Sequence, residues 1–200
     1  MSIVLKLARN RRSIRIYKHD SIEIKDILEI LETARNAPSG ANRQPWRFLI
    51  VSDRKTKVKI RRICEEIERD FHKKAPEWMK KWFKEKNISW KKDFLTDAPI
   101  LLLVFGKSDE PYWVESVWIA IGYILLAIEE KGLGTLTYTP SNTQKINKFL
   151  GIPNKYVLQA ILPIGFPYKK SGEKDRFPLN EIVYFNSWGN KINIRSFKKT

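Results

Sequence analysis

The chain has 200 residues, of which 42% are hydrophobic and 12% aromatic, so it can bury a sizeable core and is neither disordered nor fibrous. One cysteine and two histidines exclude a disulfide framework and a cysteine-cluster metal site, and they disfavour a zinc centre built on histidine. The 38 Lys and Arg against 22 Asp and Glu give a net charge of +16, which favours an anionic partner: a phosphate-bearing cofactor, a nucleic acid or an acidic surface.

Helical and extended patterns alternate in the first half of the chain. Apolar residues at helical spacing, with Ser21 in front as the N-cap, predict an amphipathic helix over Ile22–Arg35. A loop rich in Pro, Ser, Gly and Asn follows, and the apolar, β-branched run Trp46–Ser52 predicts a strand. The apolar stripe Ile60–Phe71 predicts the next helix. Three tryptophans among lysines make Ala75–Phe94 typical of an amphipathic segment, either a packing face or a lid.

Two apolar runs dominate the second half. Pro99–Phe105 shows no alternation, which predicts a central strand covered on both faces. Trp113–Ile128 is apolar on nearly every side, so we expect a helix that is buried all round, as at a subunit interface. Further along we predict a turn with positive φ at Gly132–Gly134, a strand over Thr135–Thr139, a helix over Ser141–Leu150 capped by Ser141 or Asn142, and a strand over Tyr156–Ile164.

This mixture of elements, without a repeat or a linker, predicts one α+β domain over residues 1–200. No run reaches the roughly 18 apolar residues that would span a bilayer, so we expect a soluble, cytoplasmic protein. The motifs of hydrolases and of phosphate-binding loops are missing. Cys64 lies on an apolar helix stripe, where we expect packing rather than a nucleophile, and we expect His19 and His72 at the surface.

Two clusters of residues can carry binding chemistry. The first is Arg11-Arg12-Ser13-Ile14-Arg15, whose guanidinium groups and hydroxyl suit a phosphate or another anion; a basic arm with scattered salt bridges is the equal alternative. The second runs from Ala37 to Trp46 and contains Ser39, Gly40, Asn42 and Gln44. Its small residues allow a flat ligand to approach the backbone, and its hydroxyl and amide groups can donate directed hydrogen bonds. Composition alone favours an ordinary helix-to-strand loop there.

The two clusters, in this order and separated by one helix, resemble the nitroreductase family of FMN-dependent oxidoreductases. Later landmarks appear in the family order: Ala98-Pro99-Ile100, Gly132-Leu-Gly134-Thr135, Leu162-Pro-Ile-Gly-Phe-Pro167 and Arg176-Phe-Pro-Leu-Asn-Glu-Ile-Val183. The resemblance therefore covers the chain from about Arg11 to Val183.

This resemblance implies a fold and a cofactor site. The fold is a mixed sheet flanked by helices in an intertwined homodimer, with FMN at the subunit interface. The implied FMN-binding residues are Arg11, Arg12 and Ser13 at the phosphate and ribityl chain, Arg15 at the N1 and O2 edge, Pro38, Ser39, Gly40 and Asn42 of the partner subunit over the ring, backbone groups around Tyr138 and Thr139 near N5 and O4, the main chain of Gly165, and Arg176 at the phosphate. A cation near N1 favours the anionic reduced flavin, and arginines neutralise the phosphate. Neither a catalytic side chain nor a metal is implied.

The sequence also departs from the family pattern. Many members carry a glycine near position 138, where this chain has Tyr138, which would narrow the pocket or donate a hydrogen bond there. In the segment that often covers the active site, Trp78, Trp82 and Phe83 are candidates for stacking on a substrate, although core packing is favoured for most of them.

The resemblance implies hydride transfer from NADH or NADPH through FMN to an electron-poor acceptor, such as a nitroaromatic, a quinone or a conjugated carbonyl, by a ping-pong mechanism. Dehalogenation or oxygen-dependent flavin chemistry on the same fold is an alternative. A flavin-binding protein that does not oxidise NAD(P)H is another. A basic nucleic-acid-binding protein is suggested by the net charge and by the Lys and Trp residues of Lys73–Lys92, but no nucleic-acid motif is present.

Overall fold

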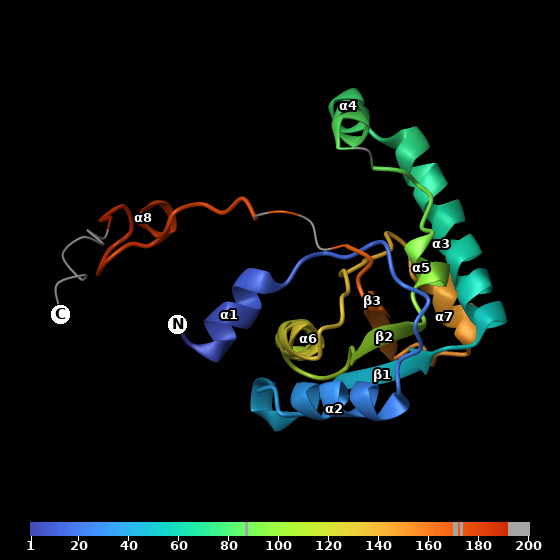
Figure 1. Ribbon diagram of the computed structural model, residues 1–200, viewed down its shortest axis with the longest axis horizontal. Helices are drawn as coiled ribbons and strands as arrows, with labels where there is room; N and C mark the ends of the chain where they lie inside the picture. Colours follow the sequence, from blue (N-terminus) through green and yellow to red (C-terminus); the bar gives the residue numbers. More distant parts are fainter. Residues whose placement is uncertain (87, 170–171, 173, 192–200) are drawn as a thin grey trace. The chain divides into compact units, whose positions relative to one another are not determined.

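The computed structural model describes residues 1–86, 88–169, 172 and 174–191 (Figure 1). Backbone contacts divide the chain into two compact units, Met1–Lys170 and Ser171–Thr200, which we describe separately. The single domain over residues 1–200 stays a prediction. None of the described helices is long and apolar enough to cross a membrane.

A three-stranded sheet lies at the centre of the first unit. Its strands are β1 (Trp46–Val51), β2 (Ile100–Lys107) and β3 (Tyr156–Ile164), paired antiparallel with β2 in the middle. The helices are α1 (Ile3–Asn10), α2 (Ile24–Arg35), the 3-10 turn η1 (Gly40–Asn42), α3 (Arg54–Lys74), α4 (Glu77–Glu85), α5 (Phe94–Asp97), α6 (Trp113–Glu130) and α7 (Gln144–Leu150). The α+β class is confirmed. The named strands are all antiparallel, and the parallel pairing is the isolated bridge between Ser13 and Thr135.

Two cores cover the two faces of this sheet, because successive residues of β2 point to opposite sides. Leu102 and Val104 pack with α2 and α6, whereas Leu101 and Leu103 pack with α3, α5 and α7. Figure 1 shows these helices on either side of the strands. The apolar run of β2 is therefore the central strand that the sequence predicts, buried on both faces.

Helix α6 is not buried all round, so that prediction is wrong for the single chain. Val117, Ile121 and Ile124 face the core, but Trp118 and Tyr123 are each 39% exposed. Both faces of this helix are apolar in the sequence. Within one chain, one face packs against the sheet and α2, and the other face is left exposed. An uncovered apolar helix face of this kind is typical of an interface between proteins.

Other boundaries differ in the irregular parts of the chain. The sequence analysis missed α1, whose first turn is capped by the Ser2 hydroxyl at 3.3 Å from the Leu5 nitrogen. Helix α2 starts at Ile24 with Glu23 as its cap, and α7 starts at Gln144 after Thr143. The predicted strand over residues 135–139 consists only of isolated bridges. Gly132 has the expected positive φ of 70°, whereas Gly134 is not in the left-handed region.

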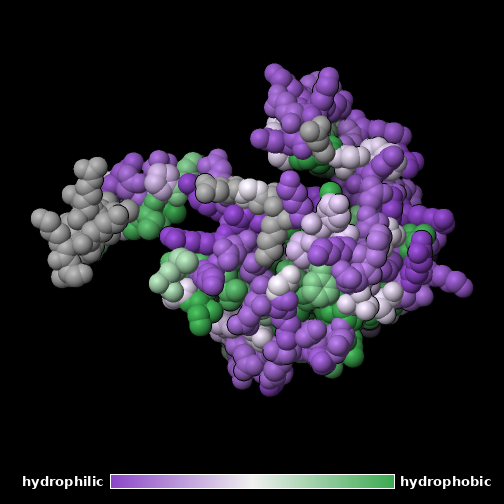
Figure 2. Space-filling model, viewed as in Figure 1, coloured by the Kyte–Doolittle hydropathy of each residue, from purple (hydrophilic) through white to green (hydrophobic). Residues whose placement is uncertain are grey.

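The second unit is small. Its helix α8 spans Leu179–Ile182, and the Tyr184 and Trp188 rings contact each other at a tilt of 35°, with centroids 4.6 Å apart. Its large apolar side chains are exposed, including Trp188 at 89%, and Figure 2 shows apolar surface over α8. These side chains could therefore be buried only by a surface outside this unit.

Candidate functional site

The first predicted cluster runs in extended form beside two chain turns. The Ile14 nitrogen donates to the Thr135 oxygen at 2.9 Å, just after α6. The turn that carries Thr135 is in turn paired with the end of β3, since Gly134 and Gly165 exchange backbone hydrogen bonds of 2.8 and 3.2 Å. Arg11, Ser13 and Arg15 thus come together with Thr135 and Gly165, and we call these five residues the arginine half-site.

Alternating burial leaves the polar side chains of this half-site accessible. Ile14 and Tyr17 are buried, and the Tyr17 hydroxyl donates to the Ile14 oxygen at 2.8 Å and the Pro163 oxygen at 3.0 Å. Burial raises the pKa of Tyr17 far above its usual range, so the hydroxyl keeps its proton. Ser13 and Arg15 are exposed on the other side of the segment. A hydroxyl and a guanidinium group therefore face solvent from a backbone that is fixed underneath.

Arg12 has a different position. Its Nη1 donates to the Arg9 oxygen at 2.5 Å and to the Asn10 oxygen at 3.0 Å, at the end of α1. A cation at a helix C-terminus satisfies carbonyl groups that lack helical partners. Arg12 thus caps α1, and its predicted contact with FMN stays a prediction. Arg176, the other predicted phosphate ligand, lies in the second unit, where its Nη1 donates to the Asp175 oxygen at 2.7 Å.

Gly165 allows the close contacts of the half-site. A Cβ built at this position would lie 2.7 Å from Tyr17 Cδ1 and 2.9 Å from Pro99 Cδ. We expect Gly165→Ala to lower the free energy of unfolding by on the order of 1–3 kcal/mol through overpacking and to weaken FMN binding. Denaturant unfolding and flavin titration measure the two effects. Gly172→Ala is the control, because a Cβ there meets nothing within 4 Å; equal stability of the two variants would contradict the account.

The second predicted cluster forms a tightly bonded loop over residues 38–45. The Gln44 nitrogen donates to the Ser39 hydroxyl at 3.0 Å, and the Gly40 nitrogen donates to the Ser116 hydroxyl of α6 at 3.1 Å. Ala41, Asn42 and Gln44 have positive φ angles of 49°, 51° and 48°. Each such non-glycine residue costs on the order of 1–2 kcal/mol, so surrounding contacts must maintain the conformation.

A buried carboxylate lies at the base of this 38–45 loop. Glu110 Oε2 accepts from Arg43 Nε at 2.5 Å, and Glu110 Oε1 accepts from Lys107 Nζ at 2.6 Å. Only 8% of the Glu110 side chain is exposed. The hydrogen bonds from Arg43 and then Lys107 lower the pKa of Glu110 to about 2, so this group is ionised at neutral pH. Sequence reasoning missed Glu110, because its partner Arg43 lies 67 positions away along the chain.

The two clusters lie at opposite ends of the central strand. Gly165 adjoins Pro99, just before β2 begins, whereas the Pro45 oxygen accepts from the Lys107 nitrogen at 2.9 Å, where β2 ends. An eight-residue strand is roughly 26 Å long at about 3.3 Å per residue. One chain therefore does not bring its own arginine half-site and its own 38–45 loop onto the same ligand.

Tyr138 points into the protein rather than into a pocket. Its ring packs edge-on against Phe94, and its hydroxyl donates to Glu68 Oε1 at 3.1 Å. Its backbone nitrogen and oxygen are both bonded to Ile161, at 3.1 and 2.8 Å. The expectation that the Tyr138 side chain narrows the pocket is therefore not met by its position. The next residue, Thr139, is exposed.

A buried ion pair lies beneath Tyr138. Lys92 Nζ is 3.2 Å from Glu68 Oε2, and their side chains are only 8% and 12% exposed. Cys64 is buried nearby, and desolvation raises the pKa of its thiol to about 12, which agrees with the predicted packing role. Sequence reasoning missed the ion pair, although Glu68 lies one helical turn after Cys64 on the same stripe of α3.

The aromatic residues of α4 divide into two groups. Trp78 and Trp82 are 67% and 44% exposed, so core packing is wrong for both. Phe83 is half-buried and stacks on His72 with ring centroids 4.2 Å apart, which leaves His72 only partly at the surface. From the aromatic face of α4, Phe83 packs against Phe71 and His72 near the end of α3. A substrate contact by Trp78, Trp82 or Phe83 stays a prediction.

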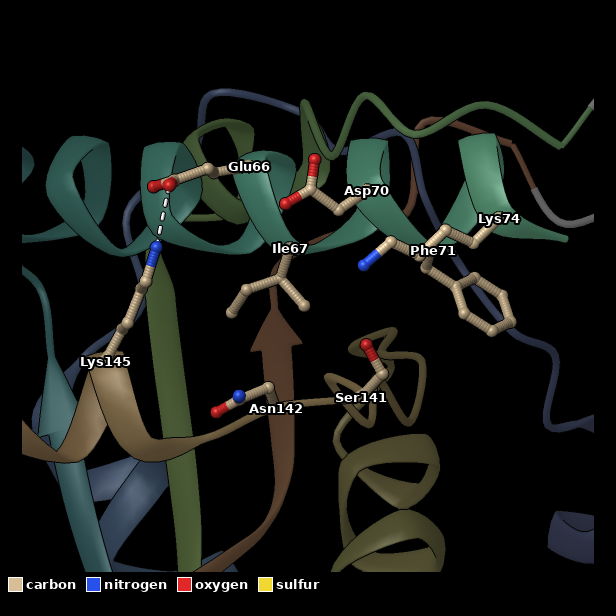
Figure 3. Close-up of a pocket in the computed structure, with 8 residues that line it drawn as sticks. All are labelled: Glu66, Ile67, Asp70, Phe71, Lys74, Ser141, Asn142 and Lys145. Atoms are coloured by element: carbon tan, nitrogen blue, oxygen red, sulfur yellow. Dashed lines mark hydrogen bonds and ion pairs between the residues drawn. The ribbon is translucent and has the colours of Figure 1, made fainter.

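A pocket of about 290 Å³ opens between α3 and the start of α7 (Figure 3). Ile67 and Phe71 give it apolar walls, and Asp70 and Lys74 extend from the same helix. On the opposite side Lys145 is paired with Glu66 at 2.7 Å, beside Ser141 and Asn142. Ser141 follows Thr139 by two residues, and the family resemblance implies that the backbone around Thr139 lies near N5 and O4 of the flavin. Among the residues that the structure describes, no group of three or more His, Cys, Asp or Glu could hold a metal ion.

Comparison with known proteins gives consistent matches. The sequence model of the nitroreductase family matches residues 8–166. The iodotyrosine deiodinase of Thermotoga neapolitana is 44% identical over 183 residues, covering 92% of this chain and 97% of that protein. Human iodotyrosine deiodinase 1 is 36% identical over 89% of this chain and 66% of its own length. A crystal structure of oxidised iodotyrosine deiodinase bound to FMN and 3-iodo-L-tyrosine superimposes with a TM-score of 0.88 at 43% identity, covering 92% of this chain and 100% of that one.

Proposed function

The chain belongs to the nitroreductase family of FMN-dependent enzymes, and from this we propose that it reductively dehalogenates a halogenated tyrosine, with 3-iodo-L-tyrosine as the first substrate to test. The observation that carries the proposal is the match to iodotyrosine deiodinases over almost the whole chain. It narrows the expected acceptor from nitroaromatics, quinones and conjugated carbonyls to an aryl halide.

The arginine half-site has a donor set that fits FMN. Arg11 and Ser13 offer charged and neutral donors to the phosphate and ribityl chain, and Arg15 offers a cation to the N1 and O2 edge of the ring. The exposed Thr139 and the main chain of Gly165 would contact the ring. When bound, FMN supplies the two electrons that, with a proton, replace an aryl carbon–halogen bond by carbon–hydrogen and release halide. We propose NADH or NADPH as the reductant.

We propose that two copies of the chain assemble each site. The separation of the 38–45 loop from the arginine half-site along β2 favours a homodimer in which one copy supplies the arginines and the other supplies Pro38, Ser39, Gly40 and Asn42. The exposed apolar face of α6 and the exposed apolar side chains of the second unit offer the area that such a dimer buries. Arg176, which the second unit carries, is proposed to reach an FMN phosphate in this dimer.

The pocket between α3 and the start of α7 suits a substrate with an aromatic ring and both charges of an amino acid. Ile67 and Phe71 offer apolar contact, while the carboxylates and ammonium groups on its walls can pair with an ammonium and a carboxylate. Trp78, Trp82 and Phe83 would cover the ring from α4. A substrate ring packed there against bound FMN would exclude water from the reacting carbon.

An acceptor comparison tests this function. Protein loaded with FMN is reduced anaerobically with dithionite and mixed separately with 3-iodo-L-tyrosine, L-tyrosine and a nitroaromatic compound. We expect iodotyrosine to reoxidise the flavin with one iodide released per flavin, and tyrosine to have no effect. If only the nitroaromatic compound reoxidised the flavin, the proposed function would be wrong and the protein would be a nitroreductase.

A further inference from the structure

We infer that Glu110 is a positioning residue that holds the 38–45 loop in the shape in which it covers the flavin of the other subunit. The inference rests on the proposed function, which gives the loop that task. The Glu110 side chain is buried, so it would act on the loop through Arg43 and not by touching the ligand.

The two oxygens of the Glu110 carboxylate bond to different parts of the fold, one to the loop and one to the sheet. Its Oε2 takes a hydrogen bond from Arg43, within the loop, and its Oε1 takes one from Lys107, the last residue of β2. The Arg43 side chain is 54% exposed, whereas the Glu110 side chain is 8% exposed, so the loop is held from inside the fold. Lys107 Nζ is also 3.3 Å from Asp109 Oδ1, but that carboxylate is 58% exposed and acts on Arg43 only weakly, through its charge.

The loop needs such an anchor because its backbone is unfavourable on its own. Ala41, Asn42 and Gln44 all have positive φ, and without external contacts their φ angles would relax to negative values. The hydrogen bond from the Gly40 nitrogen to Ser116 holds the start of the loop. The Arg43–Glu110 pair is the charged contact that holds the second half, where the positive φ angles are concentrated.

The test combines Glu110→Gln, Arg43→Gln and the double variant, with Asp109→Asn as the matched control from the same turn. We expect each single variant to raise the Kd for FMN, measured by flavin fluorescence, about tenfold, as expected for the loss of a charge-assisted hydrogen bond. The double variant should be no weaker than the singles, because both act through one contact. The visible circular dichroism of bound flavin should change in the same variants and not in Asp109→Asn.

A second readout does not need the cofactor. Trypsin should cleave the apoprotein after Arg43 faster in Glu110→Gln than in the wild type and in Asp109→Asn, because the loop is released. Unchanged cleavage together with unchanged FMN affinity would overturn the inference, as would a lower Tm with unchanged affinity. If Glu110→Gln does not fold, Arg43→Gln removes the same pair from the exposed side, and its Kd for FMN decides, because this variant lacks the trypsin site at position 43. If the wild type takes up no FMN, the proposed function fails, whereas the trypsin result still decides whether Glu110 holds the loop.

Discussion

Replacing Arg11 and Arg15 together by glutamine should weaken FMN binding by at least about a hundredfold, so that the protein is purified without its cofactor. Each charged hydrogen bond to an anion contributes about 1.5–3 kcal/mol, and the two guanidinium groups act on the same ligand. The fold should be kept, because Arg15 is exposed and the segment is held by Ile14 and Tyr17. Flavin content and a fluorescence titration with FMN measure the effect.

A matched pair of substitutions separates this effect from a loss of net charge. Lys6 and Lys18 are exposed on either side of the cluster, so Lys6→Gln with Lys18→Gln removes the same charge. Full flavin content in the arginine variant, or equal loss in both variants, would show that the predicted cluster does not bind the phosphate.

A mixed dimer of two different FMN-binding variants should contain one intact FMN site, although neither variant binds FMN as a homodimer. One chain carries Arg11→Gln with Arg15→Gln, and the other carries Gly40→Val, whose Cβ would lie 2.7 Å from Tyr112 and displace the loop. If each site takes its arginines from one copy and its loop from the other, the mixed dimer contains one intact site and one doubly defective site. We therefore expect one FMN per mixed dimer, two per wild-type dimer and none in either homodimer of variants.

Co-expression with two different affinity tags provides the mixed dimer, and the ratio of flavin to protein gives the count. Sites built within one chain predict an empty mixed dimer, because every site would then carry one defect. A folded mixed dimer without flavin would therefore contradict assembly of the site from two copies.

The regular elements could be predicted because their patterns come from burial against one sheet. The bounds of β3 agree with the prediction at both ends, and β2 is central because its apolar residues face two cores. Helix α1 was not predicted. None of its residues is buried, so it does not share the pattern of burial against the sheet from which the other helices were predicted. The exposure of α6 was not predictable for a related reason: composition shows that a helix is apolar, not whether its own chain covers it.

The sequence predicts which residues belong to the candidate site, but it does not predict how the fold arranges them. The sequence places Arg11–Arg15 and Pro38–Asn42 close together along the chain, but the sheet separates them along the length of β2. The contacts that support the site, Arg43–Glu110 and Glu68–Lys92, join residues from distant segments and carry no local pattern. Likewise, Tyr138 turns into the core because its backbone pairs with Ile161, which only the folded chain decides.

The most direct test of the central claim is the visible absorption spectrum of the purified protein under anaerobic conditions, recorded alone, after NADH or NADPH, and after 3-iodo-L-tyrosine, with dithionite as the reference reductant. The account predicts an oxidised flavin spectrum that bleaches on reduction and returns with iodotyrosine as iodide is released. A colourless protein that takes up no added FMN, or a reduced flavin that iodotyrosine leaves unchanged, would contradict it.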